Sequence, residues 1–154
     1  YIYVQKNQNK FDVIIIDFPD PNNESLNKLY TNVFYNYIKA NLTENGVMVC
    51  QSTSPYYAKN SFWCINKTVK SQFSNVIPYH LQVPSFGDWG FNLAFNGNNE
   101  MKSLMIDTKY LNSSNIPCLF VFGNDEIISL DSIEENSMFK PALITYYNKE
   151  VQNW

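Results

Sequence analysis

Arginine is absent from this chain, and all eleven basic residues are lysine. A guanidinium fork that would grip a phosphate or a carboxylate at two points is therefore excluded. Histidine is nearly as scarce: His80 is the only one, so a cluster of histidine metal ligands is excluded as well. The three cysteines, Cys50, Cys64 and Cys118, lack the spacing of metal ligands, and we expect them to be reduced, buried thiols. We accordingly expect no metal and no prosthetic group.

Long hydrophobic runs are also missing. No apolar stretch approaches the ~20 residues of a membrane span, and no secretory signal opens the sequence. The net charge of -3 has the opposite sign to that of a nucleic-acid-binding surface. Apolar residues make up 45% of the 154, which is enough for a hydrophobic core. These features indicate a cytoplasmic domain over residues 1–154 that does not bind nucleic acid.

The most informative segment is an apolar run that ends in two carboxylates. Residues 11–16 are rich in isoleucine and valine, and Asp17-Phe18-Pro19-Asp20-Pro21 follows directly. Such a run predicts a buried parallel strand with helices on both faces. Open α/β sheets bind ligands beyond the carboxyl ends of such strands, so the carboxylate pair predicts a site that handles cations. The alternative is an acidic turn that ends the strand and caps the next helix.

Hydrophobic periodicity predicts an α/β fold. Strands are expected at 11–17, 47–51, 76–83 and 89–95. Helices are expected at 25–42, 58–73 and 138–154, residues 1–10 form a helix tail or a linker, and 101–137 contain only short elements. Asn45-Gly46 is expected to end the first helix as a C-terminal cap. This order of elements predicts a mostly parallel sheet that finishes with an antiparallel hairpin.

Several of these segments resemble one protein family. Asp17-x-x-Asp20-Pro21 resembles the Asp-x-x-Asp-Pro motif of spermidine synthases and other polyamine aminopropyltransferases. Pro84-Ser85-Phe86 and Gly90-Phe91 are similar to the family's Pro-Thr-Tyr-Pro and Gly-Phe stretch. The resemblance covers most of residues 11–125. It is closest to a bacterial subgroup with a Trp-Gly-Phe motif, whose longer members often have a membrane-embedded N-terminal part.

The resemblance implies one part of a larger catalytic domain. The family's Gly-rich loop, its acidic ribose-binding residue and its Asp-Ala adenine motif precede the strand at 11–17, and this sequence contains none of them. We therefore expect the C-terminal half of a Rossmann-like sheet of the S-adenosylmethionine-dependent methyltransferase type, mostly parallel with one antiparallel strand. The expected strand order is 11–17, 46–51, 89–95, 76–83. The first strand would then be an edge that pairs with the missing N-terminal half or with a second copy in a homo-oligomer.

The resemblance also implies a reaction. Family members transfer an aminopropyl group from decarboxylated S-adenosylmethionine, a co-substrate, to a polyamine such as putrescine. Asp17 is then expected to be the general base and Asp20 to hold the amine, while Gln51 and Tyr79 supply orienting hydrogen bonds. Phe86 is expected at the substrate in place of a family tyrosine, which leaves the choice of acceptor open. The chain alone is expected to be inactive, because the nucleoside-binding half is not in it.

Other interpretations remain for the same residues. Gln51 could be a strand-end cap and Tyr79 a half-buried strand aromatic, while Trp89 and Phe91 are expected in the core rather than against a ligand. The same sheet would suit a methyltransferase-like enzyme with another acceptor, or a non-catalytic assembly module. Use of a methyl donor would identify the methyltransferase-like enzyme. A chain that shows no thermal shift with any sulfonium nucleoside would favour the assembly module.

Overall fold

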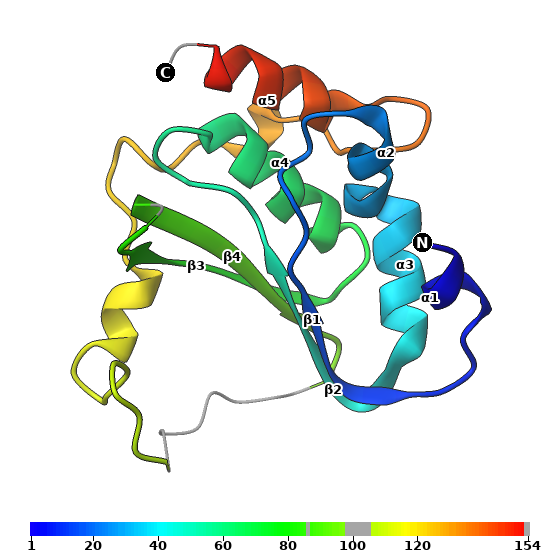
Figure 1. The fold of residues 1–154 in the computed structure, drawn as a ribbon, viewed down its shortest axis with the longest axis horizontal. Coiled ribbons are helices and arrows are strands. Elements are labelled where there is room, and N and C mark those ends of the chain that lie inside the picture. Colours follow the sequence, from blue (N-terminus) through cyan, green and yellow to red (C-terminus); the bar gives the residue numbers. More distant parts are fainter. Residues whose placement is uncertain (86, 98–105, 153–154) are drawn as a thin grey trace.

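The structure is a computed structural model that describes residues 1–85, 87–97 and 106–152. Its centre is a four-stranded sheet in the order β1-β2-β4-β3 (Figure 1), formed by β1 (Phe11–Ile16), β2 (Leu42–Gln51), β3 (Asn75–Val83) and β4 (Gly87–Phe95). β1 pairs with β2 in parallel, and β4 is antiparallel to both β2 and β3. The predicted fold class, strand order and single antiparallel strand are therefore confirmed.

The helices are short. In chain order they are α1 (Ile2–Lys6), α2 (Glu24–Asn27), the 3-10 turn η1 (Lys28–Tyr30), α3 (Asn32–Asn41), α4 (Lys59–Lys70), the 3-10 turns η2 (Ile116–Phe120) and η3 (Leu130–Ser132), and α5 (Ala142–Val151). None of these described helices is long and apolar enough to cross a membrane.

Two helices differ from the sequence pattern. The helix predicted at 25–42 is divided at Thr31, whose backbone is extended and whose hydroxyl accepts a hydrogen bond from Phe34 N at 3.3 Å. Threonine is favoured there because its oxygen satisfies a free amide at the start of α3. α5 occupies only 142–151 of the predicted 138–154, because Pro141 immediately precedes its first turn. Residues 153–154 lie outside the described part of the chain.

Gly46 lies inside a strand, so the predicted helix cap is wrong. β2 begins at Leu42, directly after α3. The register with β1 shifts here, because Phe11 is opposite Leu42 whereas Val13 is opposite Val47. A Cβ at Gly46 would lie 2.9 Å from the Phe11 carbonyl oxygen. Glycine therefore lets the two strands approach each other at this irregularity.

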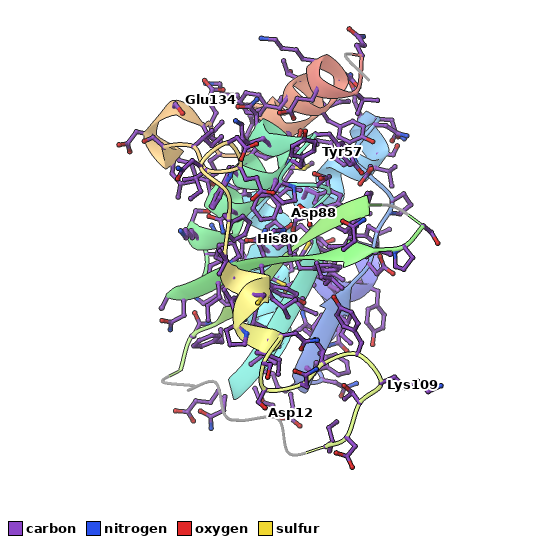
Figure 2. The ribbon with its side chains drawn as sticks, turned by 90° about the vertical axis from the view of Figure 1, so that its left-hand side faces the viewer. Asp12, Tyr57, His80, Asp88, Lys109 and Glu134 are labelled. Atoms are coloured by element: carbon purple, nitrogen blue, oxygen red, sulfur yellow. The ribbon has the colours of Figure 1, made fainter. Side chains whose placement is uncertain are left out.

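One face of the sheet is covered and the other is largely open, which corrects the prediction of helices on both faces. Figure 1 shows α3, α4 and α5 gathered on one side of the sheet. Successive strand residues point to opposite faces, so Ile16 belongs to the core whereas Val13 is 57% exposed and Ile15 is 73% exposed. η2, yellow in Figure 2, contacts the far edge strand β3.

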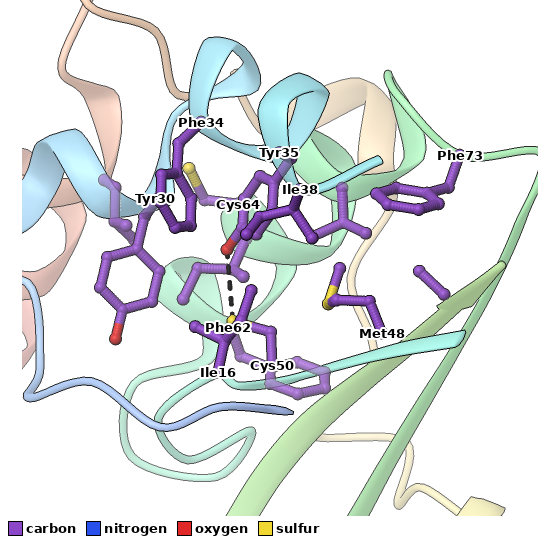
Figure 3. Close-up of a cluster of buried hydrophobic side chains, with 14 of the residues drawn as sticks. Ile16, Tyr30, Phe34, Tyr35, Ile38, Met48, Cys50, Phe62, Cys64 and Phe73 are labelled. Atoms are coloured by element: carbon purple, nitrogen blue, oxygen red, sulfur yellow. Dashed lines mark hydrogen bonds between the residues drawn. The ribbon is translucent and has the colours of Figure 1, made fainter. Parts of the chain in front are cut away.

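The core lies between the covered face of the sheet and the helices (Figure 3). Its largest fully buried apolar and aromatic side chains are Tyr30, Tyr35, Phe34, Phe62, Ile38, Met48, Ile65, Leu143 and Val69. The Tyr35 hydroxyl lies 3.3 Å from Cys50 Sγ, the contact marked in Figure 3. Burial raises the pKa of Cys50 and of Cys64 to about 12, so both thiols stay protonated. Cys118 is exposed, against the prediction of a buried thiol.

The single histidine joins the β3–β4 hairpin to the loop after η2. His80 Nδ1 lies 2.8 Å from Asp88 Oδ1, its Nε2 lies 2.7 Å from the Val121 carbonyl oxygen, and its ring stacks on Phe122 (His80 and Asp88 are labelled in Figure 2). A ring with an acceptor at both nitrogens can satisfy both only as the imidazolium. Burial lowers the pKa of His80, but Val121 and Asp88 raise it by more, and the net pKa is above 6.5.

We predict that His80 titrates above pH 6.5 and that stability falls as the pH rises. Because the folded pKa is raised, the stabilisation is complete below the unfolded pKa and is lost as the pH rises through the folded pKa. The ring-proton NMR resonance of this one histidine gives the midpoint directly. Asp88→Asn should lower the midpoint, whereas Asp131→Asn on η3 should not. A wild-type midpoint at or below 6.5 would contradict this bonding pattern.

Candidate active site

A cleft opens at the carboxyl ends of β1 and β2. Ile16 is opposite Cys50 in the parallel register, so Asp17 leaves β1 beside Gln51, the last residue of β2. Together with Trp89, these two residues line two adjoining pockets of about 410 and 470 Å³. Open α/β sheets bind their ligands at this position.

The two carboxylates of the cleft differ in how they are held. The Asp17 side chain is exposed, and its carboxylate accepts no hydrogen bond from the residues that the structure describes. Asp20 is half-buried and both of its oxygens have donors: Gln51 Nε2 at 3.2 Å from Oδ1, and the Tyr147 hydroxyl at 2.9 Å from Oδ2. The two carboxylates can therefore serve different tasks. The one without a partner can accept a proton, and the one held by two donors can bind a cation.

Tyr30 fixes the loop that carries both carboxylates. Its side chain is fully buried, and its hydroxyl lies 3.1 Å from the Pro19 carbonyl oxygen and 3.3 Å from Gln51 Oε1. Burial raises the pKa of this phenol far above its ordinary value, so the hydroxyl remains a donor. Gln51 thus has Tyr30 at its amide oxygen and Asp20 at its amide nitrogen, and these two contacts set the orientation of the amide.

Aromatic rings form one wall of the cleft. Tyr79 of β3 stacks on Phe91 of β4, with ring centroids 5.2 Å apart and an angle of 16° between the planes. Trp89 also lines the cleft and contacts Tyr57, with centroids 6.2 Å apart. The sequence pattern predicts Trp89 and Phe91 in the core, but the alternation along β4 places them on the open face. Their ring faces can attract a cation.

Gly90, between these two aromatic residues, faces the core. A Cβ at this position would lie 2.5 Å from the Phe62 ring. The Gly90 N–H donates to the Thr53 carbonyl oxygen at 2.6 Å, and the Ser52 N–H donates to the Gly90 carbonyl oxygen at 2.9 Å. Glycine thus lets β4 pack closely against α4 and the segment after β2, and this packing holds the aromatic wall in place.

The structure gathers most of the site residues predicted from the sequence. Asp17, Asp20, Gln51 and Tyr79 all line the cleft. Phe86 lies outside the described residues. Asp17 and Asp20 lie in the loop after β1, and Gln51 is the last residue of β2. Tyr79 lies in the middle of β3, level with Gln51 because both are opposite Phe91 of β4.

Three contributors are missed by the sequence pattern. Trp89 is assigned to the core, and Tyr30 is one of several apolar positions in a helical stripe. Tyr147 lies in the terminal helix, 127 residues from its partner Asp20. The Trp-Gly-Phe motif could have signalled Trp89, but no local pattern indicates a contact as distant in sequence as that of Tyr147.

A second cluster of ionisable groups lies on the hairpin. His80, Asp88 and Glu126 place ligand atoms within 4.8 Å of one another. Both His80 nitrogens already face acceptors inside the protein, so the imidazolium has no lone pair for a metal ion. Glu126 accepts a hydrogen bond from Gly123 N. These contacts anchor the hairpin to the loop.

The sheet order and the cleft at its strand ends are those of a methyltransferase-like α/β domain. Comparison with known proteins narrows this class. The family model for the spermine/spermidine synthase domain matches residues 1–105, and the chain belongs to this family. The family resemblance noted in the sequence motifs is therefore confirmed.

Individual relatives agree with the family model. The chain is 39% identical to the polyamine aminopropyltransferase of Leptospira interrogans over 151 residues, which cover 97% of this chain and 30% of that relative. It is 38% identical to the enzyme of the same name from Oceanobacillus iheyensis over 148 residues, with coverages of 94% and 29%. The chain thus spans less than a third of the length of these relatives.

Solved structures show the same similarity. Spermidine synthase from Thermotoga maritima has a TM-score of 0.68 and 27% identity, over 80% of this chain and 44% of that one. A spermidine synthase in complex with the transition state analogue AdoDATO has a TM-score of 0.66 and 26% identity, over 80% of this chain and 43% of that one.

Proposed function

We propose that this chain supplies the acceptor-amine part of the active site of a polyamine aminopropyltransferase. The carrying observation is the pair Asp17 and Asp20 at the end of β1, beside an aromatic wall. Membership of the spermine/spermidine synthase family supports aminopropyl transfer as the reaction. The solved relative in complex with AdoDATO supports decarboxylated S-adenosylmethionine as the co-substrate.

The reaction requires a base beside the attacking amine. An alkylamine with a pKa near ~10.4, as in lysine, arrives protonated and is not nucleophilic. We assign Asp17, which has no hydrogen-bond partner among the described residues, as the group that takes a proton from this nitrogen. The nitrogen then attacks the carbon next to the sulfonium. A C–N bond forms, the C–S bond breaks with its electron pair passing to sulfur, and methylthioadenosine leaves.

Asp20 holds the acceptor cation in this proposal. Each carboxylate oxygen has a second lone pair, so Asp20 can accept from an ammonium group while it keeps its bonds to Gln51 and Tyr147. Tyr79 and Trp89 offer ring faces to the methylene chain and to the positive sulfur. Putrescine, a short diamine, is the acceptor we propose.

Substitution of the carboxylates tests this assignment. In the protein that contains this chain, Asp17→Asn should lower kcat by about 10²-fold or more, because general-base catalysis contributes about 10²–10⁴-fold. Asp20→Asn should chiefly raise the KM for putrescine. Asp12→Asn is the matched control, because Asp12 lies on β1 and binds Thr43 rather than the cleft.

These rates are measured by chromatography of the methylthioadenosine that is released. Near-normal turnover in Asp17→Asn would refute its role as the base. Methyl transfer from S-adenosylmethionine, without aminopropyl transfer, would instead establish the methyltransferase-like alternative.

We also propose that the 154 residues alone do not support turnover, because a Gly-rich loop and an acidic ribose partner for a nucleoside are not among them. Calorimetry of this chain with methylthioadenosine should show no binding tighter than roughly millimolar, a free energy of about -4 kcal/mol. Micromolar binding would contradict the proposal that the donor site needs further residues.

The free edge of β1 supports a partner strand from outside this chain. β2 pairs with β1 on one side, and no strand in the described residues pairs on the other. The run 13–16 contains no lysine, proline or glycine that would protect its backbone from pairing. We propose that this edge pairs with a segment of a longer parent or with a second copy of the chain.

In the absence of a parent segment, the isolated chain should dimerise through β1. Ile15→Lys places a charge on the open face of this strand, where Ile15 is 73% exposed, and should shift sedimentation equilibrium to the monomer. Ile127→Lys, at an exposed position outside the sheet, is the control and should still dimerise. A wild-type chain that sediments as a monomer would contradict pairing with a second copy.

A further inference from the structure

The carboxylate of Asp20 is held from the far end of the chain. Tyr147, on helix α5, donates its hydroxyl to Asp20 Oδ2 at 2.9 Å. Burial raises the pKa of this phenol and the charge of Asp20 adds to the shift, so the hydroxyl remains protonated and remains a donor. Tyr147 lies beyond residue 105, where the family model ends, but within the stretch that aligns with the full-length relatives.

Glu150 docks α5 in the position from which Tyr147 reaches the cleft. Helix α4 has no side-chain cap of its own. The Glu150 carboxylate accepts hydrogen bonds from the backbone N–H groups of Asn60 (2.6 Å) and Ser61 (3.1 Å) and from both of their side chains (2.7 Å each). An anion at a helix N-terminus is stabilised by the free amides and by the helix dipole.

Tyr147 and Glu150 share one face of α5, because residues three apart in a helix are neighbours on its surface. The bond of Glu150 to α4 therefore limits where the Tyr147 hydroxyl can lie. α4 in turn packs against the sheet that carries the cleft. The chain of contacts runs from the sheet through α4 and α5 back to the loop after β1.

We propose that Tyr147 is a positioning residue for the acceptor amine, which fixes the Asp20 carboxylate in the orientation that binds the amine cation. This inference rests on the proposed aminopropyl transfer and extends its site to helix α5. Gln51 and Tyr147 hold the two carboxylate oxygens from different elements, which sets the plane of the group.

Tyr147→Phe removes only the hydroxyl. In the protein that contains this chain, the KM for putrescine (1,4-diaminobutane) should rise about tenfold, as expected for the loss of a hydrogen bond to a charged group. The kcat and the KM for the sulfonium donor should change little. Tyr146→Phe is the matched control, because its hydroxyl accepts a hydrogen bond from Glu134 N at 3.2 Å. A merely structural role of Tyr147 would alter all the kinetic parameters together.

Glu150→Gln gives a second test, since it weakens the docking of α5 without altering the cleft. It should raise the same KM by a smaller factor. If Tyr147→Phe does not fold, this variant provides the comparison instead. Calorimetry with 1,4-diaminobutane alone separates this inference from the reaction, because the dissociation constant should rise in Tyr147→Phe and not in Tyr146→Phe. If the wild type binds the diamine but transfers no aminopropyl group, the proposed function fails and the positioning role stands. Equal diamine affinity in Tyr147→Phe and the wild type, or no diamine binding at all, overturns the positioning role.

Discussion

The parallel pairing of β1 with β2 is the contact on which the candidate site depends. It aligns the carboxyl ends of the two strands, so Asp17 emerges beside Gln51. The pairing is held by the core, where Ile16, Met48 and Cys50 pack beneath the helices. The bulge at Gly46 absorbs the register shift at the opposite end of β1 and leaves this end regular.

A network of hydrogen bonds converts this alignment into a defined site. Tyr30 contacts the Gln51 oxygen, Gln51 donates to Asp20, and Tyr147 donates to the same carboxylate. The donors come from η1, β2 and α5, so the orientation of Asp20 depends on packing throughout the domain. A partly buried network of this kind is costly to disrupt, because each lost donor leaves an acceptor unsatisfied.

The strand order could be predicted from the sequence, because apolar runs, helical stripes and family motifs all indicate the same sheet. The positions of Asp17, Asp20 and Gln51 could be predicted for the same reason, since strand ends meet at one edge. The break at Thr31 and the bulge at Gly46 could not, because they arise from packing that local propensity does not encode. The contact of Tyr147 with Asp20 could not either, because it depends on how α5 docks on α4. The exposure of Val13 and Ile15 could not be predicted either, because their apolar character alone indicates burial. They are exposed because that face of the sheet is largely open in this chain.

The most direct test of the acceptor site is a crystal structure of the protein that contains this chain, with 1,4-diaminobutane and methylthioadenosine bound. We predict one amine nitrogen within hydrogen-bond distance of an Asp17 oxygen, about 2.7–3.2 Å, and close to Asp20, with the methylene chain against Tyr79 and Trp89. A diamine bound away from both carboxylates would contradict the assignment. So would an Asp17 side chain that points out of the cleft in this complex.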